Sequence, residues 1–258
     1  MNHLELFSGT HSFGKVSSKL GYNVISLDRD LDAECPLNSG YISDTHIKED
    51  IMTWNYKIYP KGHFKLITAS PVCLWWSNIR NTWIGRKLKS HGDTIITKDI
   101  LEEDIERYGV PMVDRLFEII DYFKPQFYLI ENPQTGKMKK YINDLVPYYD
   151  VDYCKYSDWG YRKTSRFWTN IRGLINNRCK KDCTNMIISN NQKLHRNRMG
   201  SGRTIIDNNK IIRVNTAELR KKYKNFKDCA KDYSVAENIL ERYRIPPKLI
   251  EELFKLTL

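Results

Sequence analysis

The sequence contains no long hydrophobic run. No stretch approaches the roughly 20 consecutive apolar residues that a membrane-spanning helix needs. The first residues, MNHLELFSG, lack both the basic and the apolar segment of a secretion signal. We therefore expect an intracellular protein without a membrane partner.

Cysteine is scarce, with six residues in a chain of 258. In a reducing compartment we expect thiols rather than disulfides, so that each cysteine packs, binds a metal or acts as a nucleophile. Cys179, Cys183 and His195 have a spacing that loosely resembles a zinc site, but no fourth ligand is evident, although Cys229 is a candidate. Free thiols in an irregular segment are the simpler interpretation, and we predict no metal site.

Acidic residues are too few to balance the basic ones. The 31 Asp and Glu residues face 42 Lys and Arg residues, which gives a net charge of +11, and the excess is concentrated in residues 161–231. Such a charge favours a polyanionic partner, because neutralising phosphates releases counterions; a lysine-rich solvated surface is the alternative. Residues 1–60 are nearly balanced, so we expect one part of the chain to handle a small molecule and another to hold a polyanion.

Strand-like and helix-like segments alternate along the first 170 residues. The length and the 41% hydrophobic content suffice to bury one large core. The alternation predicts an α/β fold, a mostly parallel sheet with crossover helices. The segments with strand character are 3–7, 23–28, 64–70 and 126–133, those with helix character are 15–21, 99–123 and 136–145, and residues 151–170 resemble a β-hairpin.

Periodicity weakens after residue 170. We predict a core of residues 1–170, a small irregular basic lobe of residues 171–231, and a C-terminal helical segment of residues 232–258 that returns to the core. The last segment has helical character on both sides of Pro246 and Pro247.

A strict G-x-G-x-x-G motif is absent, which disfavours a dinucleotide site. A glycine turn does follow the first strand, as SGTHSFG at residues 8–14. Such a turn lets the backbone approach a nucleoside cofactor closely and points a helix N-terminus at its polar tail. Asp28 ends the second strand, where a carboxylate can accept both hydroxyls of a ribose; a helix cap is the alternative.

Two reactive side chains follow other strands of the predicted sheet. Cys73 lies in a turn after the third strand, in ASPVC, and Glu131 ends the fourth, in LIENP. A buried structural cysteine and a solvated or capping carboxylate are the local alternatives. Together the two groups match the needs of attack on a pyrimidine: a thiolate adds to C6 while a carboxyl group binds the N3 and exocyclic amine edge, which makes C5 nucleophilic.

Seven short blocks carry a family resemblance, in the order LFSG, SLD, EDI, ASPVCLWWS, IENP, RKTSRFW and YRIPPKLI. They resemble the C5-cytosine-specific DNA methyltransferases, most closely the short forms of phages and large viruses. Order and approximate spacing hold from residue 4 to about residue 250, and only a matched recognition segment is missing.

The resemblance implies a Rossmann-like, S-adenosylmethionine-dependent methyltransferase fold in which residues 171–231 form the target-recognition lobe. The implied reaction transfers a methyl group from S-adenosylmethionine to C5 of a cytosine flipped out of double-stranded DNA, through a covalent Cys73 adduct at C6. The implied enzyme is a monomer in the cytoplasm of a microbial or virus-infected cell, or in the nucleus of a eukaryotic host.

The resemblance also implies a role for individual residues. Cys73 is the nucleophile, Glu131 binds the cytosine, Asn132 holds the catalytic loop, Arg166 contacts the cytosine O2, and Arg162 supports the site or a phosphate. The implied cofactor pocket comprises Phe7, Ser8, Gly9, Thr10, Phe13, Asp28 on the ribose, Arg29, Asp50 near the adenine amine, Ile51, Ser70 and Pro71, and is completed by Pro246 and Pro247. DNA contacts are implied for Ser77, Arg80, Arg86, Lys163, Arg196, Arg198 and Arg203.

The chain departs from the family pattern at several positions, none of which removes a reacting group. Val72 stands where a second proline usually precedes the cysteine, and Pro133 stands where a valine usually follows the Glu-Asn pair. The glycine turn reads THSFG rather than carrying two adjacent glycines. Arg162 replaces the glutamine, and Thr164 the first arginine, of the usual Gln-x-Arg-x-Arg block.

Two other functions also fit the sequence. One is an RNA (tRNA) cytosine-5 methyltransferase, because the lobe is short for reading several base pairs, and the other is a catalytically inactive DNA-binding relative. The basic segments 78–90 and 195–203 fit either loops over DNA or flexible surface loops. Trp75 and Trp76 fit either contact with the flipped base or core packing.

Overall fold

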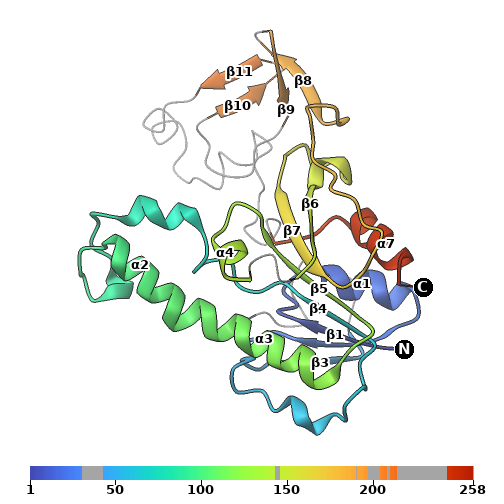
Figure 1. The fold of residues 1–258 in the computed structure, drawn as a ribbon. Coiled ribbons are helices and arrows are strands. Elements are labelled where there is room, and N and C mark those ends of the chain that lie inside the picture. Colours follow the sequence, from blue (N-terminus) through green and yellow to red (C-terminus); the bar gives the residue numbers. More distant parts are fainter. Residues whose placement is uncertain are drawn as a thin grey trace.

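A seven-stranded sheet with helices on both faces forms the centre of the molecule (Figure 1). The structure is a computed structural model that describes residues 1–30, 43–142, 146–189, 191–196, 204–207, 210–213 and 243–257. The strand order is β3-β2-β1-β4-β5-β7-β6; β7 is antiparallel to both of its neighbours, and the other pairs are parallel. The strands are β1 (Asn2–Leu6), β2 (Asn23–Leu27), β3 (Thr45–Ile47), β4 (Leu66–Ala69), β5 (Phe127–Pro133), β6 (Tyr148–Asp152) and β7 (Thr164–Thr169).

This strand order confirms the predicted Rossmann-like fold. The chain runs outward from β1 to β3 on one side and from β4 to β5 on the other, so the order reverses between β1 and β4. In such doubly wound sheets, ligands bind at the carboxyl ends of the strands beside the reversal. The predicted parallel strands are present, and β6 with β7 confirms the predicted hairpin. The edge strand β3 was not predicted, because three residues are too few to show a period.

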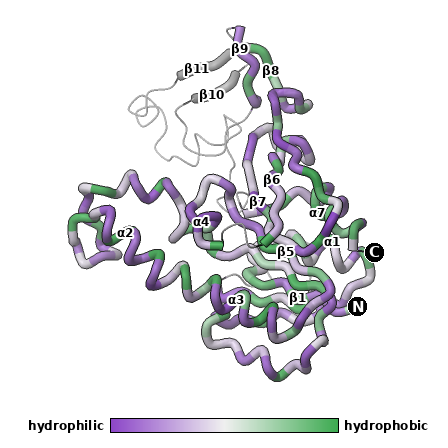
Figure 2. Tube along the Cα trace, viewed as in Figure 1, coloured by the Kyte–Doolittle hydropathy of each residue, from purple (hydrophilic) through white to green (hydrophobic). Residues whose placement is uncertain are grey.

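Alternation along β1 divides the interior into two layers. Leu4 and Leu6 pack in the cluster that includes α3 (Val110–Phe123), whereas His3 and Glu5 contact α1 (Ser12–Lys19). The helix α7 (Pro247–Lys255) packs beside α1 on that second face (Figure 1). Figure 2 shows apolar residues concentrated on the central strands, while α3 alternates between apolar and polar residues.

The remaining elements are short. Two antiparallel hairpins, β8 with β9 and β10 with β11, lie where weak periodicity predicted an irregular lobe. The helix after the Pro-Pro pair is confirmed as α7, while residues 214–242, which include most of the predicted helix before that pair, lie outside the described residues. These short elements are η2 (Tyr56–Ile58), η3 (Asn78–Trp83), η4 (Lys89–His91), α4 (Met138–Ile142), η7 (Tyr153–Lys155), β8 (Met186–Ser189), β9 (Gln192–His195), β10 (Thr204–Asp207) and β11 (Lys210–Arg213).

The predicted helix over residues 99–123 is interrupted in the structure. It consists of α2 (Lys98–Asp104), a π-helical turn η5 (Ile105–Gly109), and α3. Pro111 lacks an N–H group, and a wider turn just before it resets the hydrogen-bond register. Gly109 lets this turn approach the buried Trp76, because a β-carbon at residue 109 would lie 2.9 Å from the tryptophan ring.

No helix within the described ranges is both long and apolar enough to cross a membrane.

A buried histidine connects α1, on the second face, to the sheet. His3 is fully buried, its Nδ1 lies 2.7 Å from the Ser17 hydroxyl of α1, and its Nε2 lies 2.8 Å from the Thr68 hydroxyl of β4. Burial lowers the pKa of His3 from 6.5 to about 4, against the opposing charge of Glu5. The imidazole is therefore neutral at physiological pH, as its two hydroxyl partners allow.

This pKa predicts acid lability. Between pH 6.5 and 4 the unfolded chain binds a proton at His3 and the folded chain does not, so acid favours unfolding. This difference in proton binding reduces the free energy of unfolding by up to about 1.4 kcal/mol for each unit by which the pH falls in that window. Urea unfolding at several pH values checks this: His3→Gln is expected to flatten the slope, whereas His63→Gln, outside the network, keeps it. An unchanged slope in His3→Gln would contradict the assignment.

Candidate active site

The turn after β1 has an uncommon backbone. Phe7, Gly9 and His11 have φ angles of 53°, 49° and 51°, in the left-handed region that side chains other than glycine seldom adopt. Two backbone hydrogen bonds close the turn, from Ser8 N–H to Leu27 O and from His11 N–H to Ser8 O. The strain is concentrated at the sheet reversal, where a ligand is expected.

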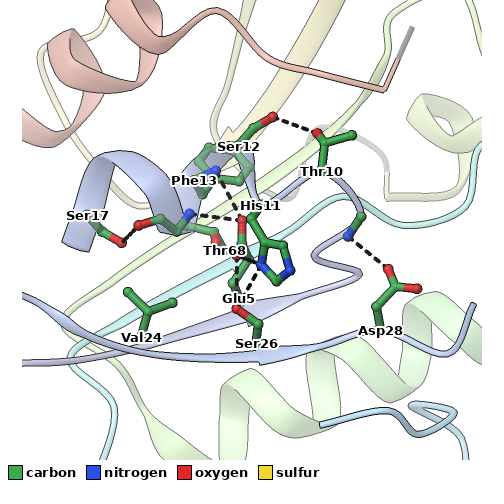
Figure 3. Close-up of polar contacts among 12 residues, drawn as sticks. Glu5, Thr10, His11, Ser12, Phe13, Ser17, Val24, Ser26, Asp28 and Thr68 are labelled. Atoms are coloured by element: carbon green, nitrogen blue, oxygen red, sulfur yellow. Dashed lines mark hydrogen bonds and ion pairs between the residues drawn. The ribbon is translucent and has the colours of Figure 1, made fainter. Parts of the chain in front are cut away.

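A buried carboxylate holds this turn in place (Figure 3). Glu5 is 1% exposed, and its Oε1 accepts hydrogen bonds from the backbone N–H groups of Phe13 and Gly14, at the start of α1. Its Oε2 lies 3.2 Å from His11 Nδ1 and accepts a hydrogen bond from the Ser26 hydroxyl. Burial acts to raise the pKa of Glu5, but the hydrogen bond with His11, nearby histidine charge and the Gly14 amide outweigh it and lower the pKa. The carboxylate therefore fastens the turn to β1, β2 and α1 together.

The predicted cofactor residues after β2 and β3 meet beside the turn. Asp28 Oδ2 accepts the N–H of Gly9 at 2.9 Å (Figure 3), and Arg29 pairs with Asp50 at 3.2 Å. The Ser8 hydroxyl is buried and has no hydrogen-bond partner among the described residues. An unsatisfied hydroxyl beside two carboxylates fits a polar ligand with hydroxyl and amine groups, such as a nucleoside.

Asn132 connects the end of β5 to the loop that follows β4. Its Nδ2 donates to the carbonyl oxygen of Pro71 at 2.8 Å, and the side chain is 1% exposed. This contact would support the predicted role of Asn132 in holding the loop of Cys73. Val72 is 42% exposed, so the residue that replaces the family proline lies on the surface of the loop.

The Trp-Trp pair anchors the far side of the same loop. Trp76 is 1% exposed and packs in the core, and Trp75 stacks on Tyr108 with ring centroids 4.6 Å apart. Of the two interpretations of the pair, core packing therefore holds for Trp76.

The buried carboxylate of Glu131 has two partners that the sequence blocks did not identify. The hydroxyl of Tyr153 donates to Glu131 Oε1 at 2.9 Å, and the Nζ of Lys163 lies 3.8 Å from the same oxygen. Lys163 was predicted to contact DNA, but its side chain is buried beside Glu131.

Cys73 responds to both of these charges. Burial raises the pKa of the Cys73 thiol, the carboxylate of Glu131 raises it further, and the ammonium group of Lys163 lowers it. Cys73 and Glu131 are 58 positions apart in the sequence but share one electrostatic environment. Cys73 lies in the loop after β4, Glu131 lies on β5, and these two strands are neighbours in the sheet.

Arg166 and Arg162 lie on β7 and in the loop just before it, and both are held by acids of β6. Arg166 donates through Nε and Nη2 to the two oxygens of Asp150, at 2.8 and 2.9 Å, and its guanidinium group lies 3.6 Å from the centre of the Tyr148 ring. Arg162 donates to Asp152 at 3.0 Å. Contacts of either arginine with a cytosine or a phosphate remain predictions.

The residues predicted to contact DNA are dispersed. Arg80 is 2% exposed and donates to Asp104, so in this conformation it is not available to a phosphate. Ser77 caps η3 by accepting the N–H of Ile79. Arg86 and Arg196 are exposed, and Arg196 donates to the carbonyl oxygen of Asp158. Arg198 and Arg203 lie outside the described residues.

Sequence reasoning missed Glu5, His11 and Tyr153. The signal for Glu5 was present, because an acid in the middle of the apolar strand HLEL has to be paired when the strand is buried. Tyr153 gave no comparable signal, since its contact with Glu131 depends on the pairing of β5, β7 and β6.

Comparison with curated proteins finds a close relative. A protein of Frog virus 3 (isolate Goorha), described as "Probable DNA (cytosine-5)-methyltransferase", is 39% identical over 190 residues, which are 72% of this chain and 79% of that protein. A scan of known protein-family profiles finds no match.

Comparison with solved structures gives more distant similarities. The S. pombe Dnmt2 methyltransferase is 15% identical, with a TM-score of 0.41, over 67% of this chain and 50% of that one. The Entamoeba histolytica methyltransferase EhMeth is 15% identical, with a TM-score of 0.43, over 69% and 56%. This chain thus spans about half the length of these structures. On its identity with the viral relative over most of both chains, the chain belongs to the DNA (cytosine-5)-methyltransferase family.

Proposed function

We propose that this protein transfers a methyl group from S-adenosylmethionine to C5 of cytosine in double-stranded DNA. The observation that carries the proposal is the shared environment of Cys73 and Glu131, a half-buried thiol whose pKa responds to a buried carboxylate on the neighbouring strand. The membership of the family and the viral origin of the relative support it. We place the reaction in the cytoplasm or nucleus of an infected cell.

Cys73 acts on the pyrimidine as the nucleophile. The thiolate forms a bond to C6, and the electron pair of the C5–C6 double bond becomes available at C5. Glu131 binds the N3 and exocyclic amine edge and stabilises the charge that develops on the ring. Tyr153 and Lys163 fix the position of the Glu131 carboxylate, from the contacts described above.

S-adenosylmethionine supplies an electrophilic methyl group on a sulfonium centre. The turn of residues 7–11, held by Glu5, would hold its polar groups, with Asp28 for the ribose and Asp50 for the adenine. A base is then needed for the C5 proton before the bond to Cys73 breaks and restores the aromatic ring.

The target cytosine has to leave the stack, because C6 is covered by neighbouring bases in a duplex. The net charge of +11 supports binding to the phosphate backbone. Exposed apolar residues on and near the catalytic loop, Val72, Leu74, Ile79 and Ile84, lie where they could meet base surfaces, and Arg86 accompanies them.

Loss of the nucleophile is the first test. Cys73→Ala is expected to reduce methyl transfer to duplex DNA by about 10³-fold or more, because the thiol that adds to C6 is removed, while binding of S-adenosylmethionine is retained. Transfer of a labelled methyl group to duplex DNA and to tRNA is measured side by side, with Ser18→Ala on the exposed face of α1 as the control. Wild-type transfer to tRNA alone would assign the RNA reaction, and cofactor binding without transfer to either would indicate an inactive relative.

The pH dependence of the rate tests the environment of Cys73. Because burial and Glu131 raise the pKa of this thiol, the reactive thiolate becomes more abundant as pH rises, and kcat is expected to increase from neutral to alkaline pH. Lys163→Met removes the charge that lowers this pKa and is expected to move the inflection to higher pH, whereas Lys163→Arg keeps it near the wild-type position. An inflection that Lys163→Met leaves in place would contradict this account.

Binding of the cofactor tests the role of Glu5. Glu5→Gln removes the charge that the buried amides and His11 require, and is expected to cost about 1–3 kcal/mol of the free energy of unfolding and to weaken S-adenosylmethionine binding about tenfold. Calorimetric titration and urea unfolding measure the two effects, with the exposed Glu103→Gln as the matched control. Wild-type affinity in a Glu5→Gln protein would show that the turn does not depend on this carboxylate.

A further inference from the structure

Four potential metal ligands from three separate segments converge beside the basic lobe. Cys154 lies in η7, Cys179 and Cys183 flank a tight turn, and His195 ends β9. The four ligand atoms lie within 4.8 Å of one another, and His195 Nε2 is 3.6 Å from Cys179 Sγ and 3.4 Å from Cys183 Sγ. The sequence had indicated three of these residues but not Cys154.

These separations match those between the ligands of a tetrahedral zinc ion. With Zn–S bonds of about 2.3 Å and Zn–N bonds of about 2.0–2.1 Å, a sulfur and a nitrogen ligand lie about 3.6 Å apart. The spacing of Cys179 and Cys183, with three residues between them, also lies within the range common in structural zinc sites. Thiol–imidazole hydrogen bonds would account for two of the contacts but not for the approach of a third sulfur.

We propose that Cys154, Cys179, Cys183 and His195 bind a structural Zn²⁺ ion. Four protein ligands fill the tetrahedral shell, so the ion has no open position for a reacting water and serves the fold. Binding releases the thiol protons to solvent, because the thiolate is the ligand. Cys229, the earlier candidate for the fourth ligand, lies outside the described residues.

The surroundings of the cluster position its ligands. The carboxylate of Asp152, which is fully buried, accepts the backbone N–H of Cys179 at 2.7 Å. Asn185 is 1% exposed and donates to the carbonyl oxygens of Cys154 and Ser157, at 3.0 and 2.7 Å. These hydrogen bonds fix the backbone of two of the four ligand residues, Cys154 and Cys179.

The local charges suit the complex. Three thiolates and one neutral imidazole around Zn²⁺ carry a net charge of −1. Lys155 pairs with Asp182 inside the cysteine turn at 2.8 Å, and Arg162 and Arg178 both donate to Asp152. These three cations and two carboxylates leave one positive charge, which offsets the single negative charge of the complex.

The ion would join the basic lobe to the catalytic core. Cys154 follows Tyr153, whose hydroxyl bonds to Glu131, and His195 ends the hairpin β8–β9. The zinc ion would therefore fix the lobe at Cys154, one residue from Tyr153, which holds the carboxylate of Glu131.

The metal content of the purified full-length chain tests the proposal. Wild-type protein expressed with added zinc is expected to hold about one zinc ion per chain by mass spectrometry of the metal. Replacing zinc with Co²⁺ is expected to give the intense visible bands of tetrahedral cobalt and a thiolate-to-cobalt charge-transfer band. Cys183→Ser and His195→Ala are expected to lose the metal, whereas Cys73→Ser and His63→Gln are expected to keep it.

Each outcome decides the proposal without reference to methyl transfer. Zinc retained by Cys73→Ser, which lacks the nucleophile, supports the site even if the proposed reaction fails. If the ligand variants do not fold, the cobalt spectrum of the wild-type chain and a lower melting temperature after chelation decide instead. Wild-type protein without zinc and without the tetrahedral cobalt spectrum would overturn the proposal, as would a disulfide between two of the three cysteines in freshly purified protein.

Discussion

The buried carboxylate of Glu5 makes the interactions on which the proposed cofactor side of the molecule depends. A charged group inside a sheet is tolerated only when its acceptor sites are filled, and here they are filled by two amides at the start of α1, by His11 and by Ser26. The same contacts compel the chain between β1 and α1 to follow one path, including left-handed residues that would otherwise be unfavourable. The strain is thus stabilised by the sheet and does not depend on the ligand.

The proposed catalytic side of the molecule depends on the antiparallel end of the sheet. Because β7 returns between β5 and β6, it brings Lys163 to the carboxylate of Glu131, while β6 leads into Tyr153 on the other side. A purely parallel sheet would place a crossover helix at this position. The antiparallel insertion therefore supplies both partners that hold Glu131, and Asn132, the next residue, holds the loop of Cys73.

Much of the fold could be predicted because its signals are local. The strands leading to Ser8, Asp28, Cys73 and Glu131 are short apolar runs that end in polar residues, and the blocks around them carry the family resemblance. What could not be predicted depends on contacts between distant segments. Nothing in the sequence near Cys154 indicates that it approaches residues 179–195, and a basic loop gives no sign that Arg80 is neutralised by Asp104, 24 positions later. The sequence does not indicate the π-helical turn, because the apolar spacing of residues 99–123 continues across it.

Asp104 has a consequence for the basic segment that follows the loop of Cys73. Its carboxylate binds Arg80 and also His91, 3.0 Å away, and residues 85–87 pair with residues 95 and 96 across the base of the segment. Because Asp104 ends α2, its carboxylate fixes two separate points of this segment, Arg80 and His91, to that helix. The exposed side chain of Arg86 lies between these two points and is therefore presented to solvent from a closed loop and not from a free chain.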